Sequence, residues 1–476
     1  MRLVSLLALA GLSACAVGPD YQMPKPVAPP QAELTEATDL ATVSDASLPD
    51  RWWRLFNNPD LDRLVESALI YNSDVRIAAA NLQRARALLS ESGAARLPFT
   101  SASAGAARAR TAPDRGGTGN ASDYYSAGFD ASYEVDLFGG VSRSVEAARA
   151  DVSAAGAQLD AARVAVAAET ARTYSSACGF GLQAEVARTT AKLQRQTQDL
   201  TLRLFKGGSI SQREVDRATV LVEQANAQIA TFEAEHRAAL HALAVLTGQS
   251  PSDVDPAAER CAVVPSIASP IPIGDGRSLL ARRPDIRVAE RILAADTARI
   301  GVATAALFPS ITLLGSITLG GADVKDVGKR AGFSWSAGPL LSWNFPFNGA
   351  ARARVRENRA IAEGSLAGFD KAVLTALQET QQALSRLAGA LDRETSLRKA
   401  RDAAEHAAFL TDRRFSFGAD SFLDLLDAQR TLATANGAMA AAEADRAEAQ
   451  IILFKALGGG WSDAPQPVRP PIFSQP

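Results

Sequence analysis

Two aspartates in the last quarter of the chain are spaced so that their carboxylates could act together. Asp424 and Asp427 are three positions apart, so a helix would present both carboxylates on one face. They follow residues 415–419, in which Gly418 would permit a tight chain reversal. Carboxylates grouped in this way attract cations. The simpler alternative is a solvated helix face, which is the usual place of charged side chains.

No other group of residues predicts catalysis or metal binding. The histidines lack the spacing of a metal site. They are His236, His241 and His406. The sequence has no nucleophile motif, phosphate-binding loop, dinucleotide fingerprint or marked acid–base pair. The arginines before Pro284 indicate a helix start, with Asp285 in its first turn, rather than a binding site. We therefore expect neither enzyme activity nor a bound cofactor.

The composition indicates a large, mostly helical protein. The 476 residues have a formal net charge of -2 and 21% charged side chains, so nucleic acid is not an expected partner. Aromatic residues make up 6%, whereas alanine is abundant, which favours long helices packed through small side chains. After the N-terminus no run reaches about 18 apolar residues, so a mature transmembrane helix is not expected.

The N-terminus has the pattern of an export signal. Arg2 precedes an apolar run over residues 3–12, and two small residues then lead to Cys15. This end resembles the lipobox of bacterial lipoproteins, in which the cysteine becomes the acylated, palmitate-bearing mature N-terminus. Ala16, in place of aspartate, then indicates delivery to the outer membrane. Alternatively, an ordinary signal is cut near residue 14 and Cys15 is a free thiol.

Two further cysteines, Cys178 and Cys261, permit one disulfide without proving it. On expected helices, Cys178 would lie about 40 Å from the first chain reversal and Gly248, on the returning helix, about 60 Å from it. The 13 residues after Gly248 could bring Cys261 back to Cys178. The pairing stays open at this point.

The chain contains a tandem duplication with an offset of about 210 residues. Four landmarks recur in the same order in both halves. The pairs are 75–80 and 286–291, 134–139 and 344–349, 203–205 and 413–415, and 246–248 and 456–458. Within each half we expect a short helix, a pair of strands, a very long helix, a tight turn and a long returning helix.

Alternating apolar and polar residues predict four strands. They span about 98–111, 124–138, 309–320 and 331–346. Each is about ten residues long with aromatic residues toward its ends, which is typical of strands that cross a bilayer. A soluble antiparallel sheet would also alternate. In lipid the strands must close into a barrel, and four cannot do so, so several chains would share one barrel.

The segments 141–205 and 350–415 contain no proline and are rich in helix-forming residues. About 65 residues of helix would extend about 95 Å, a length that suits a rod across the periplasm. A soluble coiled coil would have the same helical pattern, but its sequence would not alternate with pairs of strands.

These features divide the chain into six expected segments. They are a signal peptide at 1–14, a lipidated N-terminus with an extended arm at 15–50, a first repeat at 51–248 with a hairpin tip at 205–210, a connecting equatorial segment at 249–285, a second repeat at 286–460 with a hairpin tip at 415–420, and a C-terminal tail at 461–476.

The chain resembles the TolC-like outer-membrane factor family, in particular its NodT-like lipoprotein branch. The resemblance covers nearly the whole sequence and is carried by stretches that are specific together and modest singly. They are Cys15 with Gly18-Pro19-Asp20-Tyr21, 280–286, Phe308-Pro309-Ser310 and 422–429. The resemblance implies a mainly α fold with a transmembrane β-barrel. Three copies would form a twelve-stranded β-barrel continued by a twelve-helix periplasmic α-barrel.

The resemblance also implies a function and partners. The homotrimer would be the passive outer-membrane channel of a tripartite efflux pump, for multidrug or toxic-compound export. A periplasmic adaptor protein and an inner-membrane resistance-nodulation-division transporter would dock with it. The only covalent addition would be the lipid on Cys15. The rivals are the duct of a type I protein secretion system, which usually lacks a lipobox, and a periplasmic coiled-coil scaffold without a pore.

By similarity, the residues near the hairpin tips form a periplasmic gate. In a trimer, Asp424 and Asp427 would each become a ring of three carboxylates that attracts cations and constricts the closed duct. Arg430 matches a neighbouring polar link of the lipoprotein branch. At the first tip, Glu214 or Asp216 occupies the corresponding acidic position.

Overall fold

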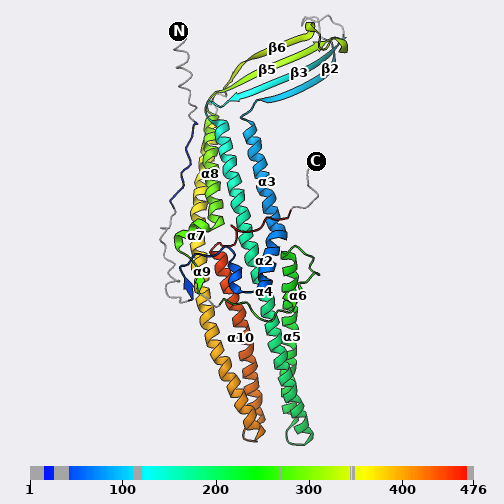
Figure 1. Cartoon of the computed structure of the whole chain (residues 1–476), viewed down its shortest axis with the longest axis vertical. Coiled ribbons are helices and arrows are strands. Elements are labelled where there is room, and N and C mark those ends of the chain that lie inside the picture. Colours follow the sequence, from blue (N-terminus) through cyan, green and yellow to red (C-terminus); the bar gives the residue numbers. More distant parts are fainter. Residues whose placement is uncertain are drawn as a thin grey trace. The chain divides into compact units, whose positions relative to one another are not determined.

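A computed structural model describes residues 16–25, 42–110, 121–267, 270–343, 345 and 349–468. The described part is mainly helical, with one four-stranded sheet (Figure 1). The chain divides into two compact units. The first comprises residues up to Lys25, Asn81–Ala155 and Val288–Asp370, and the second comprises Pro26–Ala80, Gly156–Arg287 and Lys371–Pro476. Each unit therefore takes segments from both repeats.

The long helices have the same lengths in the two repeats. Helix α4 spans Gly140–Lys206 and α9 spans Ala350–Ser416, with 67 residues each. The returning helices, α5 at Gln212–Leu246 and α10 at Phe422–Ala456, have 35 residues each. Equivalent helices are offset by 210 residues at both ends. The tandem architecture predicted from the sequence is confirmed.

The other helices are shorter. They are η2 (Trp52–Phe56), α2 (Pro59–Tyr71), α3 (Ser73–Ala94), α6 (Pro256–Glu259), α7 (Gly276–Arg282), α8 (Pro284–Ala305), η4 (Val324–Asp326) and η5 (Arg330–Gly332). Helix α8 begins at the predicted proline, whose fixed φ suits a first helical turn. The buried Arg283 before it donates to Asp285 at 2.7 Å, Glu379 at 2.6 Å and the carbonyl of Ala456 at 2.7 Å. Its role is structural.

The first unit contains an antiparallel sheet in the order β2-β3-β5-β6. Its strands are β2 (Phe99–Arg110), β3 (Ala121–Val135), β5 (Ser310–Gly321) and β6 (Phe333–Ser342). Strand β3 ends three residues before the predicted boundary. Asp136 lies just outside the sheet and accepts the backbone N–H groups of Val141 at 2.9 Å and Ser142 at 2.7 Å. Its side chain thus caps the first turn of α4.

The strand register gathers the apolar side chains on one face of this sheet. Phe129 pairs with Ile317, which pairs in turn with Trp335. These three side chains are 45–69% exposed. The other face is mainly polar, although Leu314 and Leu340 lie on it, and the hydroxyls of Ser316 and Ser336 are 2.8 Å apart across neighbouring strands. A bare apolar face of this kind requires an apolar environment outside the single chain.

The second unit has an aromatic core at the start of the first repeat. Trp52 and Trp53 are almost fully buried, and the Trp52 ring stacks on Phe454 of α10 with centroids 4.8 Å apart. Beside this core, strand β1 (Val43–Ser44) pairs in parallel with β4 (Ile271–Pro272). The start of the first repeat and the end of the second therefore pack together.

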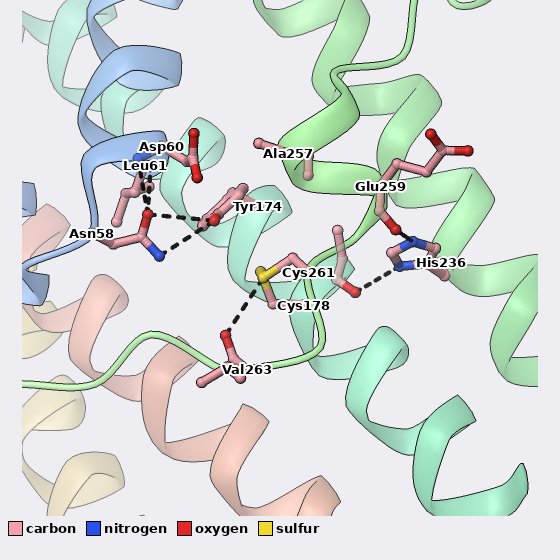
Figure 2. The surroundings of a disulfide bond; sticks show 12 residues. Asn58, Asp60, Leu61, Tyr174, Cys178, His236, Ala257, Glu259, Cys261 and Val263 are labelled. Atoms are coloured by element: carbon pink, nitrogen blue, oxygen red, sulfur yellow. Dashed lines mark hydrogen bonds between the residues drawn. A yellow bond between two sulfur atoms is a disulfide. The ribbon is translucent and has the colours of Figure 1, made fainter.

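Cys178 and Cys261 are joined by a disulfide in the second unit (Figure 2). Cys178 lies in α4, and its Cα is 4.7 Å from that of Cys261, which follows α6. Beside this bond, the ring nitrogens of His236 in α5 lie 2.8 Å from the carbonyl oxygen of Ala177 and 3.0 Å from that of Glu259. The segment after α6 is thus fixed to both α4 and α5.

Removing this disulfide should destabilise the protein. We expect Cys178→Ala/Cys261→Ala to lower the free energy of unfolding by about 2–4 kcal/mol, because the bond restricts the unfolded chain. Denaturant unfolding of the purified protein, followed by tryptophan fluorescence, measures the change. Reduction of the parent should reproduce it and should leave the variant unaffected. Equal unfolding midpoints for the oxidised parent and the variant would contradict the expectation.

Candidate functional site at the hairpin tips

Each long helix reverses direction at a glycine in the left-handed region. After α4, Gly208 has φ 72° and donates its N–H to the carbonyl of Phe205 at 2.9 Å. After α9, Gly418 has φ 75° and donates to Phe415 at 2.9 Å. Other residues rarely adopt this conformation, so glycine fixes both reversals. The predicted acidic residues follow each turn directly.

Glu214 and Asp424 occupy the same place in the two repeats and make the same contacts. The Asp424 carboxylate accepts the N–H of Ser421 at 3.0 Å and its hydroxyl at 2.6 Å. The Glu214 carboxylate accepts the N–H of Ser211 at 3.1 Å and also its hydroxyl. Both are capping boxes that satisfy free N–H groups at the start of a helix. The sequence patterns Ser-x-x-Glu and Ser-x-x-Asp carried this signal, which sequence reasoning missed.

These contacts hold both acids in the charged form. The hydrogen bond from Ser211 is the largest cause that lowers the pKa of Glu214 to about 2. The hydrogen bond from Ser421 likewise lowers the pKa of Asp424. Both residues are therefore fixed carboxylates at neutral pH.

Asp427 is a predicted acid on the exposed side of α10. Its side chain is 67% exposed, and its carboxylate lies 2.8 Å from the guanidinium of Arg430, which is equally exposed. At the corresponding positions the first repeat has Arg217 and Val220. This ion pair is thus specific to the second hairpin. Asp216 has no equivalent role in the structure, because it accepts only from Gln212 at 2.9 Å on its own helix.

A buried hydrogen bond fixes the helix that carries Asp427. Gln429 donates to the hydroxyl of Thr197 in α4 at 2.9 Å, and the two side chains are only 5–6% exposed. On the same side of α10, Leu425 and Leu426 are buried. The rotation of α10 is thereby set, and Asp427 and Arg430 stay on its exposed side. Sequence reasoning missed Gln429, because a single glutamine has no distinguishing pattern.

The described residues include neither the predicted lipidation site nor a metal site. Cys15 lies outside the described residues. Within the described ranges, no group of three or more histidine, cysteine, aspartate or glutamate side chains is placed to hold a metal ion. None of the described helices has the length and apolar character that crossing a membrane requires.

The model of the family described as "Outer membrane efflux protein" matches residues 64–249 and 276–459, one match in each repeat. The chain belongs to this family. Nodulation protein T of Rhizobium leguminosarum bv. viciae is 32% identical over 462 residues, which are 96% of this chain and 93% of that protein. The pyoverdine export outer membrane protein OpmQ of Pseudomonas aeruginosa is 32% identical over 473 residues, or 96% and 98% of the two chains.

The solved structure of the outer-membrane channel OprN is also similar. It superposes with a TM-score of 0.86 at 35% identity, covering 94% of this chain and all of that one. The expected resemblance and the TolC-like fold are confirmed. This outer membrane efflux protein is a channel component, and the alternative of a periplasmic scaffold without a pore is not supported.

The capping box predicts an acid-dependent loss of order at the first tip. The folded-state pKa of Glu214 is about 2, against an ordinary value of 4.5, so its contribution is present above pH 4.5 and is lost as the pH falls toward 2. After correction for the pH dependence of intrinsic amide exchange, hydrogen-exchange protection in the first turn of α5 should fall over this range in the parent. Glu214→Gln should remove this pH dependence, whereas Glu235→Gln, an exposed change on the same helix, should retain it. An identical pH profile in all three proteins would refute the role.

Proposed function

We propose that three copies of this chain form the passive exit duct of a resistance-nodulation-division efflux pump. The observation that carries the proposal is the four-stranded sheet with one bare apolar face and two unpaired edges, β2 and β6. Unpaired backbone groups are costly in lipid, so an edge strand there needs a partner. If β2 of each copy pairs with β6 of the next, three copies close twelve strands into one barrel.

The two faces of the sheet suit the two environments of such a barrel, lipid outside and water inside. The apolar face with Phe129, Ile317 and Trp335 suits lipid, while the serine-rich face suits a water-filled lumen. The helical hairpins extend the duct into the periplasm, where an adaptor protein and the inner-membrane transporter dock. The duct itself catalyses nothing, and the transporter supplies the energy.

The proposed cargo is a small toxic compound or drug. The relative OpmQ is named for the export of pyoverdine. The lipobox ending at Cys15 favours this class over type I protein secretion, whose ducts usually lack one. A wide polar lumen selects little by itself, so the partner transporter sets the choice of cargo.

The gate is proposed to lie at the second hairpin tip, where Asp427 would face the three-fold axis. Three such carboxylates form an acidic ring, and the pairing with Arg430 at 2.8 Å holds each in place. Asp424 and Glu214 contribute charge nearby, but their carboxylates also begin helices. Asp427 is therefore the cleaner residue to change.

Single-channel conductance in planar bilayers tests both the duct and the gate. We expect the parent trimer to give discrete steps that become several-fold larger in Asp427→Ala, because the carboxylate ring and its ion pair with Arg430 are lost together. Asp412→Ala removes an exposed acid from the end of α9 and should behave like the parent. Folded trimer without any channel would overturn the duct. Equal steps in parent and Asp427→Ala would overturn the gate alone.

The lipid on Cys15 is a separate proposal with its own test. Cells grown with labelled palmitate should label the parent protein, and Cys15→Ala should abolish the label completely, because the thiol is the acceptor. The variant Cys178→Ala/Cys261→Ala retains Cys15 and should be labelled like the parent. Label that persists in Cys15→Ala would place the lipid elsewhere.

A further inference from the structure

Four arginines lie in the first three turns of α9, directly after the sheet. They are Arg352, Arg354, Arg356 and Arg359, here called the α9 arginine cluster. We propose that this cluster binds the phosphate groups of anionic phospholipids in the periplasmic leaflet of the outer membrane. The proposal rests on the outer-membrane placement of the duct, but not on its gate or its cargo.

The cluster has no internal counter-charge. All four arginines are exposed, and across the described ranges none has a carboxylate within ion-pair distance. Glu357 on the same turns and Glu363 on the next turn are also exposed, and neither forms an ion pair within the described ranges. Slightly more than half of the other arginines in the described ranges form an ion pair, as Arg143 does with Asp20 at 2.6 Å. The turns therefore present a net positive surface that invites an external anion.

The positive charge of the cluster is also unfavourable at this end of α9. The N-terminus of a helix is the positive end of its dipole, so cations there are unfavourable unless something else compensates. The first turn of α9 contains no acid. The repeat supplies a natural comparison, because the positions equivalent to Arg352, Arg354 and Arg356 are Ser142, Ser144 and Glu146 in α4. The fold itself does not require arginine here.

Aromatic residues place the cluster at the depth of the lipid headgroups. Trp343 and Phe345, at the end of β6, are 45% and 52% exposed, and their rings lie 4.1 Å apart. Aromatic side chains of this kind gather at membrane–water interfaces. The cluster then begins with Arg352 and extends about 3–14 Å along the helix from its start. The headgroup layer is about 5–7 Å thick, so Arg352 and Arg354, about 3 and 6 Å from the helix start, fall within it, and Arg356, at about 9 Å, lies at its edge.

The N-terminal segment indicates which side of the helix faces the membrane surface. Arg352, Arg356 and Arg359 share one face of α9 by their spacing. Arg359 lines a hollow of about 410 Å³ together with Glu363 of the same helix and with Asp20 and Tyr21, which follow the proposed lipid attachment site by only a few residues. A lipid on Cys15 would insert into the leaflet on this side, so this face points to lipid rather than to the lumen.

The chemistry selects the anionic headgroup. A guanidinium presents paired N–H donors that match two oxygens of a phosphate. A zwitterionic headgroup brings its own ammonium group, which the arginines repel, whereas phosphatidylglycerol brings a net negative charge. Basic surfaces next to membrane-embedded segments attract anionic lipids in this way.

The test is lipid binding to the purified trimer in neutral detergent, measured by native mass spectrometry with phosphatidylglycerol and phosphatidylethanolamine. The parent should prefer phosphatidylglycerol. Arg352→Gln/Arg354→Gln/Arg356→Gln should weaken that binding by roughly 100-fold, at about fivefold per arginine. Added salt should weaken the parent's preference in the same direction.

A matched control separates the cluster from general charge loss. Lys371→Gln/Arg386→Gln/Lys399→Gln removes three exposed cations from the same helix, about 30–75 Å from its start, and should bind like the parent. Equal binding of the two lipids by the parent, or equal losses in both triple variants, would overturn the proposal. Competition by inorganic phosphate at the same concentration as the lipid would assign a soluble-anion site instead. Conductance is measured independently, so a failed lipid titration leaves the duct untouched.

Discussion

Pairing between strands of different repeats is the interaction on which the fold depends. Strand β3 of the first repeat pairs with β5 of the second over eleven positions, from Tyr125 opposite Gly321 to Val135 opposite Ile311. Each repeat alone would supply only a two-stranded hairpin, which is marginally stable. The cross-repeat pair makes a sheet of four strands and aligns their apolar side chains on one face. In each repeat the chain enters this sheet from a helix, α3 or α8, and leaves it into a long helix, α4 or α9.

The proposed gate and the α9 arginine cluster lie where the two repeats differ. Equivalent capping boxes begin α5 and α10, but the exposed Asp427–Arg430 pair occurs only in the second repeat. The disulfide joins Cys261 to Cys178 of α4, and the equivalent position in α9 is not a cysteine. Three of the four arginines in the α9 arginine cluster have serine or glutamate at the equivalent positions of α4, and Arg359 corresponds to Arg149. The duplicated scaffold supplies helices and strands, and the proposed sites rest on side chains that differ between the two repeats.

Much of the fold could be predicted from the sequence because its signals are periodic. Alternation predicted the four strands, and the long stretches without proline predicted α4 and α9. The end of β3 was missed because the Asp136 side chain accepts N–H groups at the start of α4, which ends the strand early. The alternation of apolar and polar residues carries no information about this contact. The sequence spacing left the pairing of Cys178 and Cys261 open, and the three-dimensional structure was needed to show the disulfide. The Gln429–Thr197 contact joins positions far apart in sequence, where no local pattern exists.

The equal lengths of the paired helices restrict how this protein can evolve. One residue inserted into α4 would rotate everything beyond it by about 100° and would turn buried faces outward. Substitution carries no such penalty at most exposed positions. Sequences can therefore drift far while their lengths stay nearly fixed, and the relatives follow this rule with 32% identity over 93–98% of their lengths. In this lineage, gaps in an alignment are more informative than mismatches, and they should concentrate in the turns and tails.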